Sequence, residues 1–150
     1  RRVLFRSGMI GGQVVDVASC GVGLDEGMLN FIYELKTGAL IESSMMIGAL
    51  LAGAEDAELE KVQKIASDVG IAFQIQDDIL DVTSTTEELG KPVHSDEKNE
   101  KTTYVTLKGL EKATRDVEVI SQEALELLSG LDRENTYLTQ LIRELIHRKK

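Results

Sequence analysis

The stretch FQIQDDILDV, residues 73–82, sets three carboxylates among mostly apolar side chains. Asp77, Asp78 and Asp81 fall within five residues, and residues 65–90 contain no Lys or Arg that could pair with them. The stretch ends a proline-free segment, 56–82, whose Leu, Ile, Val and Ala recur at helical intervals. This pattern predicts one long helix with Asp56 at its N-cap.

Four residues of this helix share one stripe when about 100° of rotation is assigned to each residue. They are Gly70, Gln74, Asp77 and Asp81. Asp78 falls about 100° from the stripe. Two carboxylates four residues apart repel each other, and the repulsion grows beside apolar groups. A bound Mg²⁺, which prefers oxygen ligands, would relieve it. A solvated acidic patch explains the acids alone equally well.

The rest of the chain also predicts an all-α fold. Further helices are expected over residues 9–19, 26–36, 39–51, 102–129 and 133–147, with a bend or break at Thr37-Gly38 and an interruption near Gly109. Residues 39–51 carry almost no charge, so we expect this helix to be buried. Residues 83–101 form a long polar loop, of the kind that often serves as a lid or binding loop.

Composition limits the classes of partner. The net charge is −9, with 26 acids against 17 bases, which argues against nucleic acid. No apolar run reaches the roughly 18 residues of a transmembrane helix. The single cysteine, Cys20, is expected to be a buried apolar thiol in a reducing compartment, so we expect a cytoplasmic protein.

The first residues do not match the rest of the chain. Residues 1–7, RRVLFRS, resemble the translated end of a sequencing adapter. We therefore expect a cloning or sequencing scar at 1–7, followed by the C-terminal part of one longer domain at 8–150.

Other polar residues interrupt apolar segments. Gln13 and Asp16 are three residues apart and share a helix face. Lys36 and Thr37 begin an apolar segment, and the polar loop offers Lys91 and Lys101. Snorkelling or surface exposure explains each lysine alone. Together, acids for a metal and lysines for an anion fit a diphosphate bound with Mg²⁺, beside apolar walls for a hydrocarbon tail.

Four stretches follow one another along the chain: GMIGGQVVD, KTGAL, FQIQDDILD and GKPVHSDEKNEKTTY. In order and spacing they resemble the C-terminal half of short-chain trans-prenyl diphosphate synthases, the farnesyl and geranylgeranyl diphosphate synthase family of polyprenyl synthetases. The resemblance covers nearly everything from Gly8 onward. It implies an all-α bundle of the isoprenoid-synthase type around a central cavity, here in part, with two facing aspartate-rich motifs that hold Mg²⁺.

The resemblance also implies roles for individual residues. Asp77 would bind Mg²⁺ directly and Asp81 would act nearby through water, while Gln74 would hydrogen-bond near the metal and the diphosphate. The residues matched to diphosphate binding are Lys36, Thr37, Lys91 and Lys101, and those matched to the cavity lining are Gln13 and Asp16. Among these, Lys36, Thr37, Gln74 and Asp77 are the expected catalytic residues.

The implied activity is an Mg²⁺-dependent prenyltransferase of isoprenoid biosynthesis. An allylic diphosphate would ionise, and the double bond of isopentenyl diphosphate would attack the resulting carbocation. The family's first aspartate-rich motif does not occur in this chain, so we expect the chain alone to be inactive and the full-length protein to be a homodimer. Two alternatives are a non-catalytic regulatory subunit of a heteromeric prenyl synthase and a terpene cyclase. The terpene cyclase lacks support because the Asn/Ser/Glu metal triad that is usual in such enzymes is not found in this sequence.

The metal assignment predicts the behaviour of Asp77→Ala in the full-length protein. Loss of a metal ligand should remove most prenyltransferase activity without unfolding the helix. Turnover and far-ultraviolet circular dichroism, measured together, test this. An equal loss of helicity would mean that Asp77 is structural.

Overall fold

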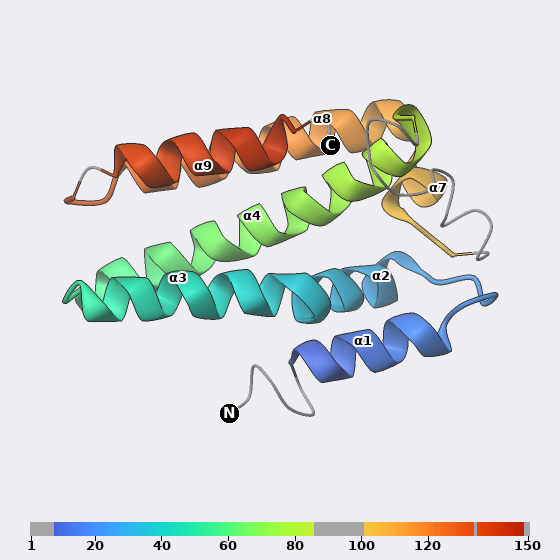
Figure 1. The fold of residues 1–150 in the computed structure, drawn as a ribbon, viewed down its shortest axis with the longest axis horizontal. Coiled ribbons are helices and arrows are strands. Elements are labelled where there is room, and N and C mark those ends of the chain that lie inside the picture. The colour runs from blue at the N-terminus through green and yellow to red at the C-terminus, as the bar shows by residue number, and fades with distance from the viewer. Residues whose placement is uncertain (1–7, 86–100, 134, 149–150) are drawn as a thin grey trace.

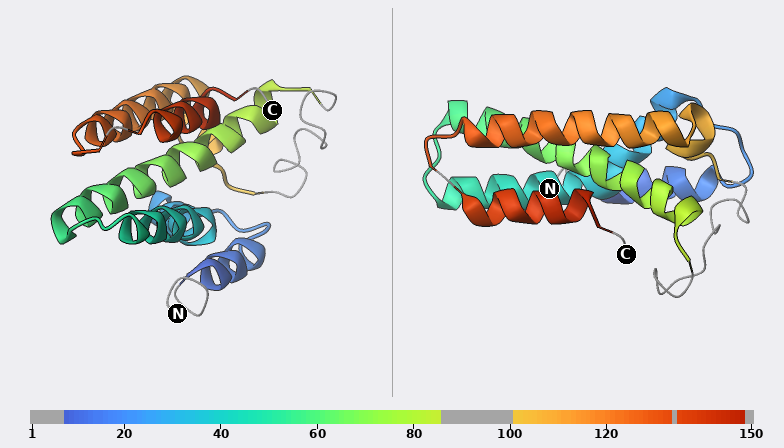
Figure 2. Two further views of the ribbon diagram at one scale, coloured as in Figure 1. Left: turned by 60° about the vertical axis from the view of Figure 1, so that its left-hand side comes forward. Right: turned by 90° about the horizontal axis from the view of Figure 1, so that it is seen from above.

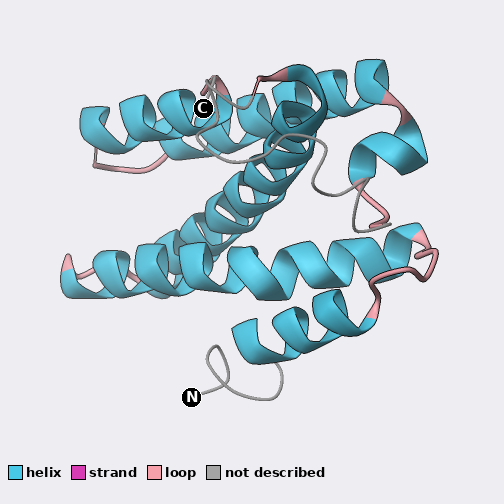
Figure 3. Cartoon of the chain, turned by 45° about the vertical axis from the view of Figure 1, so that its right-hand side comes forward, coloured by secondary structure: helices cyan, strands magenta, loops and turns pink. Residues whose placement is uncertain are grey.

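The structure is a computed structural model that describes residues 8–85, 101–133 and 135–148. Its described elements are helices α1 (Met9–Ala18), α2 (Glu26–Tyr33), the π-helix η1 (Glu34–Gly38), α3 (Ala39–Leu51), α4 (Asp56–Thr83), α7 (Tyr104–Lys108), α8 (Leu110–Ser129) and α9 (Thr136–Ile146) (Figures 1 and 3). Regular structure in these ranges is helical throughout, which confirms the all-α prediction.

Helix α4 is the centre of the bundle. It lies between α8 and α9 on one side and α2 and α3 on the other, with α1 beyond α2 and η1 (Figures 1 and 2). Its 28 residues include Ile65, Ala66, Ala72 and Ile75, which are completely buried. Burying aliphatic side chains on several faces explains why one long helix can organise the remaining ones. None of the described helices is long and apolar enough to cross a membrane.

At Thr37-Gly38, where a bend or break is expected, the helix is not broken. The chain passes from α2 through the π-helix η1 into α3 without leaving helical structure. A π-turn holds one more residue than an α-turn. The glycine at position 38 serves a different purpose, because the chain packs tightly there. A Cβ added at Gly70 of α4 would lie 2.9 Å from the Cα of Gly38.

A second close approach joins α1 to η1. A Cβ added at Gly12 would lie 2.5 Å from the backbone nitrogen of Lys36. Such a distance is far below any van der Waals contact, so only glycine fits at this position. The glycines therefore let α1, η1 and α4 meet backbone to backbone.

The ends of the helices agree only in part with the ends predicted from the sequence. Asp25 caps α2 by accepting from the Met28 N–H at 2.8 Å, and the interruption at Gly109 is confirmed, with φ of 82°. The prediction for Asp56 was wrong, because Glu55 holds the N-cap position and makes no side-chain cap hydrogen bond. Helix α9 begins three residues later than predicted, at Thr136, since Asn135 accepts from the Leu138 N–H and caps it there.

The expectation that residues 39–51 are buried was wrong. Only Ala39 of α3 is fully buried, and Leu51 is 85% exposed. Among the described residues, α3 packs mainly on α4 and η1, so its other face stays uncovered. Cys20 was also expected to be buried but is exposed. It follows α1, whose outer face carries the exposed Val14 and Val17.

The long polar loop predicted for 83–101 falls mostly outside the described residues. Thr83 still belongs to α4, and residues 86–100, with Lys91, are not described. The predicted scar at 1–7 lies outside them as well.

The contact between α4 and η1 predicts the effect of Gly70→Ala. The added methyl group would push against the Gly38 backbone, which cannot move aside as a flexible side chain could, so the free energy of unfolding should fall by about 1–3 kcal/mol. Urea unfolding measures this. Gly48→Ala in α3 is the matched control, because nothing lies within 4 Å of its added Cβ. The control should be neutral or stabilising by up to about 1 kcal/mol, and equal effects of the two changes would contradict the close-packing argument.

Candidate functional site

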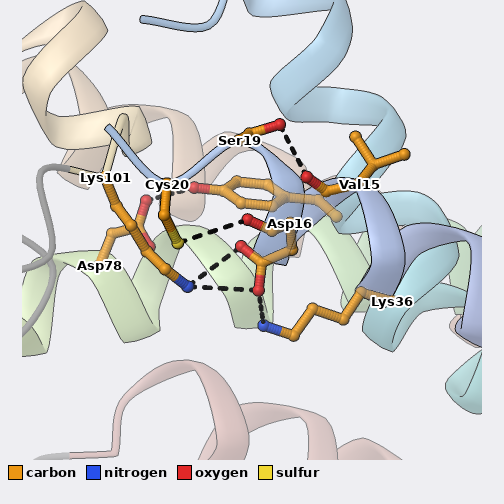
Figure 4. A network of polar contacts seen from close by, with 8 residues as sticks. Val15, Asp16, Ser19, Cys20, Lys36, Asp78 and Lys101 are labelled. Atoms are coloured by element: carbon orange, nitrogen blue, oxygen red, sulfur yellow. Dashed lines mark hydrogen bonds and ion pairs between the residues drawn. The ribbon is translucent and has the colours of Figure 1, made fainter. Parts of the chain in front are cut away.

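A single carboxylate joins two lysines from distant parts of the chain. Asp16, on α1, accepts a hydrogen bond of 2.6 Å from Lys36 Nζ of η1. It also accepts from Lys101 Nζ, which lies 3.1 Å from Oδ1 and 3.2 Å from Oδ2. Figure 4 shows both ammonium groups pointing at this carboxylate. Three segments that are far apart in sequence therefore meet at Asp16.

The two lysines decide the charge state of Asp16. Burial alone would raise the pKa of its carboxyl. The hydrogen bonds and positive charges of Lys36 and Lys101 outweigh burial and hold the pKa below its ordinary value of 3.8. The group is thus a carboxylate at neutral pH, and it accepts hydrogen bonds from both lysines.

Helix α4 supplies the opposite wall of a small polar cavity. The cavity has a volume of about 80 Å³, and its polar lining includes Asp16, Lys36, Gln74, Asp77, Asp78, Lys101, Thr102 and Thr103. Lysines thus enter from η1 and from the segment before α7, while amide and carboxylate groups enter from α4. The cavity presents cationic and anionic groups within one small volume.

Asp77 and Asp81 differ in their surroundings. The Asp77 side chain is 40% exposed, and its Oδ1 lies 3.1 Å from Nη2 of Arg148. The Arg148 guanidinium also sits 3.9 Å from the centre of the Phe73 ring, a cation–π arrangement. Asp81 is only 3% exposed and is not among the residues that line the cavity.

Asp78 is held by the polypeptide itself. Its Oδ2 accepts a hydrogen bond from the Tyr33 hydroxyl and one of 2.7 Å from the Tyr104 N–H. The Tyr104 hydroxyl in turn donates to Asp116 Oδ2 at 2.7 Å. Burial and this hydrogen bond raise the pKa of Tyr104, so its phenol remains protonated. Asp78 thus connects α2, α4 and the start of α7.

Five of the predicted site residues meet in the cavity: Asp16, Lys36, Gln74, Asp77 and Lys101. Three others do not line it. Gln13 is exposed on α1, Thr37 is partly buried in η1, and Asp81 is buried one turn beyond Asp77. Lys91 lies outside the described residues.

Sequence reasoning missed the partners of the acids. Arg148 is 71 residues from Asp77, and Tyr33 is 45 residues from Asp78. The only sequence signal for a separate role of Asp78 was its position about 100° from the acidic stripe. The TTY run at 102–104 was part of a recognised motif, but nothing in it indicated a contact with Asp78.

A larger, mainly apolar cavity lies at the other end of α4. It has a volume of about 450 Å³ and is lined by residues of α3, α4, α8 and α9, including Met45, Ala49, Val62, Leu128 and Leu138. The two cavities share no lining residue. The apolar walls expected beside the polar site therefore stay a prediction.

Comparisons with known proteins agree on one family. A profile of the polyprenyl synthetase family matches residues 4–144. The geranylgeranyl diphosphate synthase of Cyanophora paradoxa is 39% identical over 144 residues, which cover 95% of this chain and 48% of that protein. The chloroplastic heterodimeric geranylgeranyl pyrophosphate synthase large subunit 1 of Arabidopsis thaliana is 43% identical over 134 residues, or 87% of this chain and 36% of that protein.

Solved structures give the same result. A putative farnesyl-diphosphate synthase from a Marinomonas species is 32% identical with a TM-score of 0.82, over 97% of this chain and 49% of its own. A Helicobacter pylori geranyltransferase, crystallised with magnesium and isoprenyl diphosphate, is 33% identical with a TM-score of 0.78, over 97% of this chain and 49% of its own. The chain spans about half or less of the length of these proteins.

The depressed pKa of Asp16 predicts how stability depends on pH. Because the folded chain binds this proton less readily than the unfolded chain, the contribution of Asp16 is complete above the ordinary pKa of 3.8 and is lost as pH falls through the lower, folded-state value. At pH 7, Asp16→Asn should lower the free energy of unfolding by about 1–2 kcal/mol. Urea unfolding of both proteins from pH 7 to pH 3 should show this gap closing in acid. A gap that stays constant to pH 3 would show that the charge of Asp16 does not stabilise the fold.

Proposed function

The chain belongs to the polyprenyl synthetase family, and we propose that it forms the diphosphate-binding half of an Mg²⁺-dependent prenyltransferase. The reaction would condense isopentenyl diphosphate with an allylic diphosphate in isoprenoid biosynthesis. The observation that carries this proposal is the convergence of Lys36 and Lys101 on one point, with Asp77 on the facing wall of the same cavity.

The lysines would hold the diphosphate. Both ammonium groups already lie within hydrogen-bonding distance of a carboxylate, an anion whose oxygen spacing resembles that of a phosphate edge. An incoming diphosphate would share these donors with Asp16 or displace it. Negative charge on the diphosphate grows as the allylic carbon–oxygen bond breaks, so fixed cations at this place would favour ionisation.

The acids of α4 fit a magnesium ion that takes few protein ligands. Asp77 offers partly exposed carboxylate oxygens to the cavity. Residues 8–85, 101–133 and 135–148 contain no group of three His, Cys, Asp or Glu placed to hold a metal. Mg²⁺ commonly binds through one or two carboxylates, waters and substrate phosphates. When bound, the Mg²⁺ ion would neutralise negative charge on the diphosphate, and Asp77 would hold the ion. Arg148 would then release the Asp77 carboxylate or share it with the metal. Gln74 would hydrogen-bond near the metal and the diphosphate.

The remaining assignments extend the same proposal. Four further residues keep the roles that the family resemblance implies, around the five predicted residues that line the cavity. They are Gln13, Thr37, Asp81 and Lys91. The magnesium in the Helicobacter pylori geranyltransferase structure supports the choice of metal. Assembly of the full-length protein as a homodimer is proposed on the resemblance alone. Cytoplasmic location stays a prediction, and several relatives are chloroplastic.

A regulatory subunit of a heteromeric synthase is the second candidate. One relative is the large subunit of a heterodimeric synthase, so heteromeric assembly occurs among similar proteins. A non-catalytic subunit would have no need of a carboxylate and two lysines converging in one cavity. The arrangement of Asp16, Lys36 and Lys101 therefore favours the enzyme.

Binding of inorganic pyrophosphate to the 150-residue chain tests the anion site without requiring turnover. Isothermal titration with Mg²⁺ should show binding, and Lys36→Ala or Lys101→Ala should each weaken it about tenfold, the effect of losing one charge-assisted contact. Lys61→Ala is the matched control, because Lys61 is exposed and donates to Gly130 at 3.3 Å, away from the cavity. Equal weakening by all three changes, or no effect of any, would exclude the proposed site.

A further inference from the structure

We propose that Asp78 is a positioning residue that anchors residues 101–104 to α4 and so holds Lys101 at the anion site. The neighbouring Asp77 and Asp78 would then have different tasks, one toward the metal and one toward the chain. This inference rests on the proposed function for the purpose of Lys101. The anchor itself rests only on the contacts of Asp78.

The contacts of Asp78 point toward the protein. The residue is 9% exposed, and a single oxygen, Oδ2, accepts from both the Tyr33 hydroxyl and the Tyr104 N–H. The Tyr104 N–H also lies 3.2 Å from the Tyr33 hydroxyl oxygen, so the three groups form a closed triangle. Two donors from different segments thus meet at one buried carboxyl oxygen.

The anchored segment is tied at further points. The Leu24 N–H donates to Thr102 Oγ1 at 3.0 Å, and the Thr103 hydroxyl caps α7. The Tyr104 hydroxyl donates to Asp116 of α8. Lys101 is only three residues before Tyr104, so the position of the Tyr104 backbone limits where the Lys101 ammonium can reach. Fixing a cation in advance reduces the ordering that an anion would otherwise have to impose on binding.

A double-mutant cycle separates positioning through Lys101 from general structural damage. Asp78→Asn keeps the shape but replaces one of the two carboxyl oxygens by an amide nitrogen, and it should weaken pyrophosphate binding about five- to tenfold in the wild-type and Lys36→Ala backgrounds. In the Lys101→Ala background, Asp78→Asn should weaken pyrophosphate binding less than about twofold, because the lysine that Asp78 positions is no longer present. An equal factor in all three backgrounds would overturn the proposal.

The metal dependence distinguishes positioning from ligation. If Asp78 positions Lys101, then Asp78→Asn weakens pyrophosphate binding both with Mg²⁺ and with EDTA. If the loss appears only with Mg²⁺, Asp78 is a ligand and the proposal is wrong. Tyr33→Phe, which removes one donor and leaves the carboxylate, should give a smaller change in the same direction and covers the case in which Asp78→Asn does not fold.

Hydrogen exchange tests the anchor independently of any ligand. In Asp78→Asn, or in Tyr33→Phe if that variant must be used, the Tyr104 amide should exchange about tenfold faster, while the amides of α8 keep their rates. Unchanged exchange at Tyr104 would overturn the anchor even if pyrophosphate binds as proposed. Failure of the wild-type chain to bind pyrophosphate would instead refute the proposed function, and the exchange result would still decide the anchor.

Discussion

The polar cavity depends on backbones that touch. Gly12 and Gly70 stand where a single added carbon would meet the chain of η1, at 2.5 Å from the Lys36 nitrogen and 2.9 Å from the Gly38 Cα. Because α1 and α4 both approach η1 this closely, polar side chains from all three elements border one small cavity. Asp16 reaches Lys36 directly, and Gln74 and Asp77 border the same small space.

Positive and negative side chains both line the polar cavity. Lysines from two segments converge on one carboxylate, and the acids of α4 stand opposite. Two acids of FQIQDDILDV meet different partners, a guanidinium for Asp77 and the Tyr104 N–H and Tyr33 hydroxyl for Asp78, while Asp81 is buried outside this cavity. Such a set of paired charges suits a ligand that is itself a cation and an anion together, as the proposed magnesium diphosphate is.

The sequence indicated the helices well because their apolar residues recur with helical spacing and because Gly109 marks an interruption, whereas the cap at Asn135 was missed and the last helix was placed three residues too early. It also identified five residues that meet in the cavity. It could not indicate Arg148 or Tyr33 as partners of the acids, because these contacts join positions 71 and 45 residues apart. They depend on how the helices are rotated about one another.

Burial was predicted least well where charge was the only guide. A segment poor in charge, such as α3, is apolar, but its composition does not say what covers each face. Ile47, Leu50 and Leu51 are exposed for this reason. Cys20 follows the same rule, since a small apolar residue next to an uncovered helix is exposed whatever its average preference.

The π-helix η1 sets the rotational phase between α2 and α3 within one continuous rod. Its turn holds one more residue than an α-turn, so an uninterrupted α-helix of the same length would rotate one half of the rod by about 100°. Removing a single residue between Glu34 and Gly38 would instead turn the wide turn into an ordinary α-turn and leave both halves facing as they do now. The wide turn thus lets the chain carry one more residue here while α2 and α3 keep the faces that they present to their neighbours.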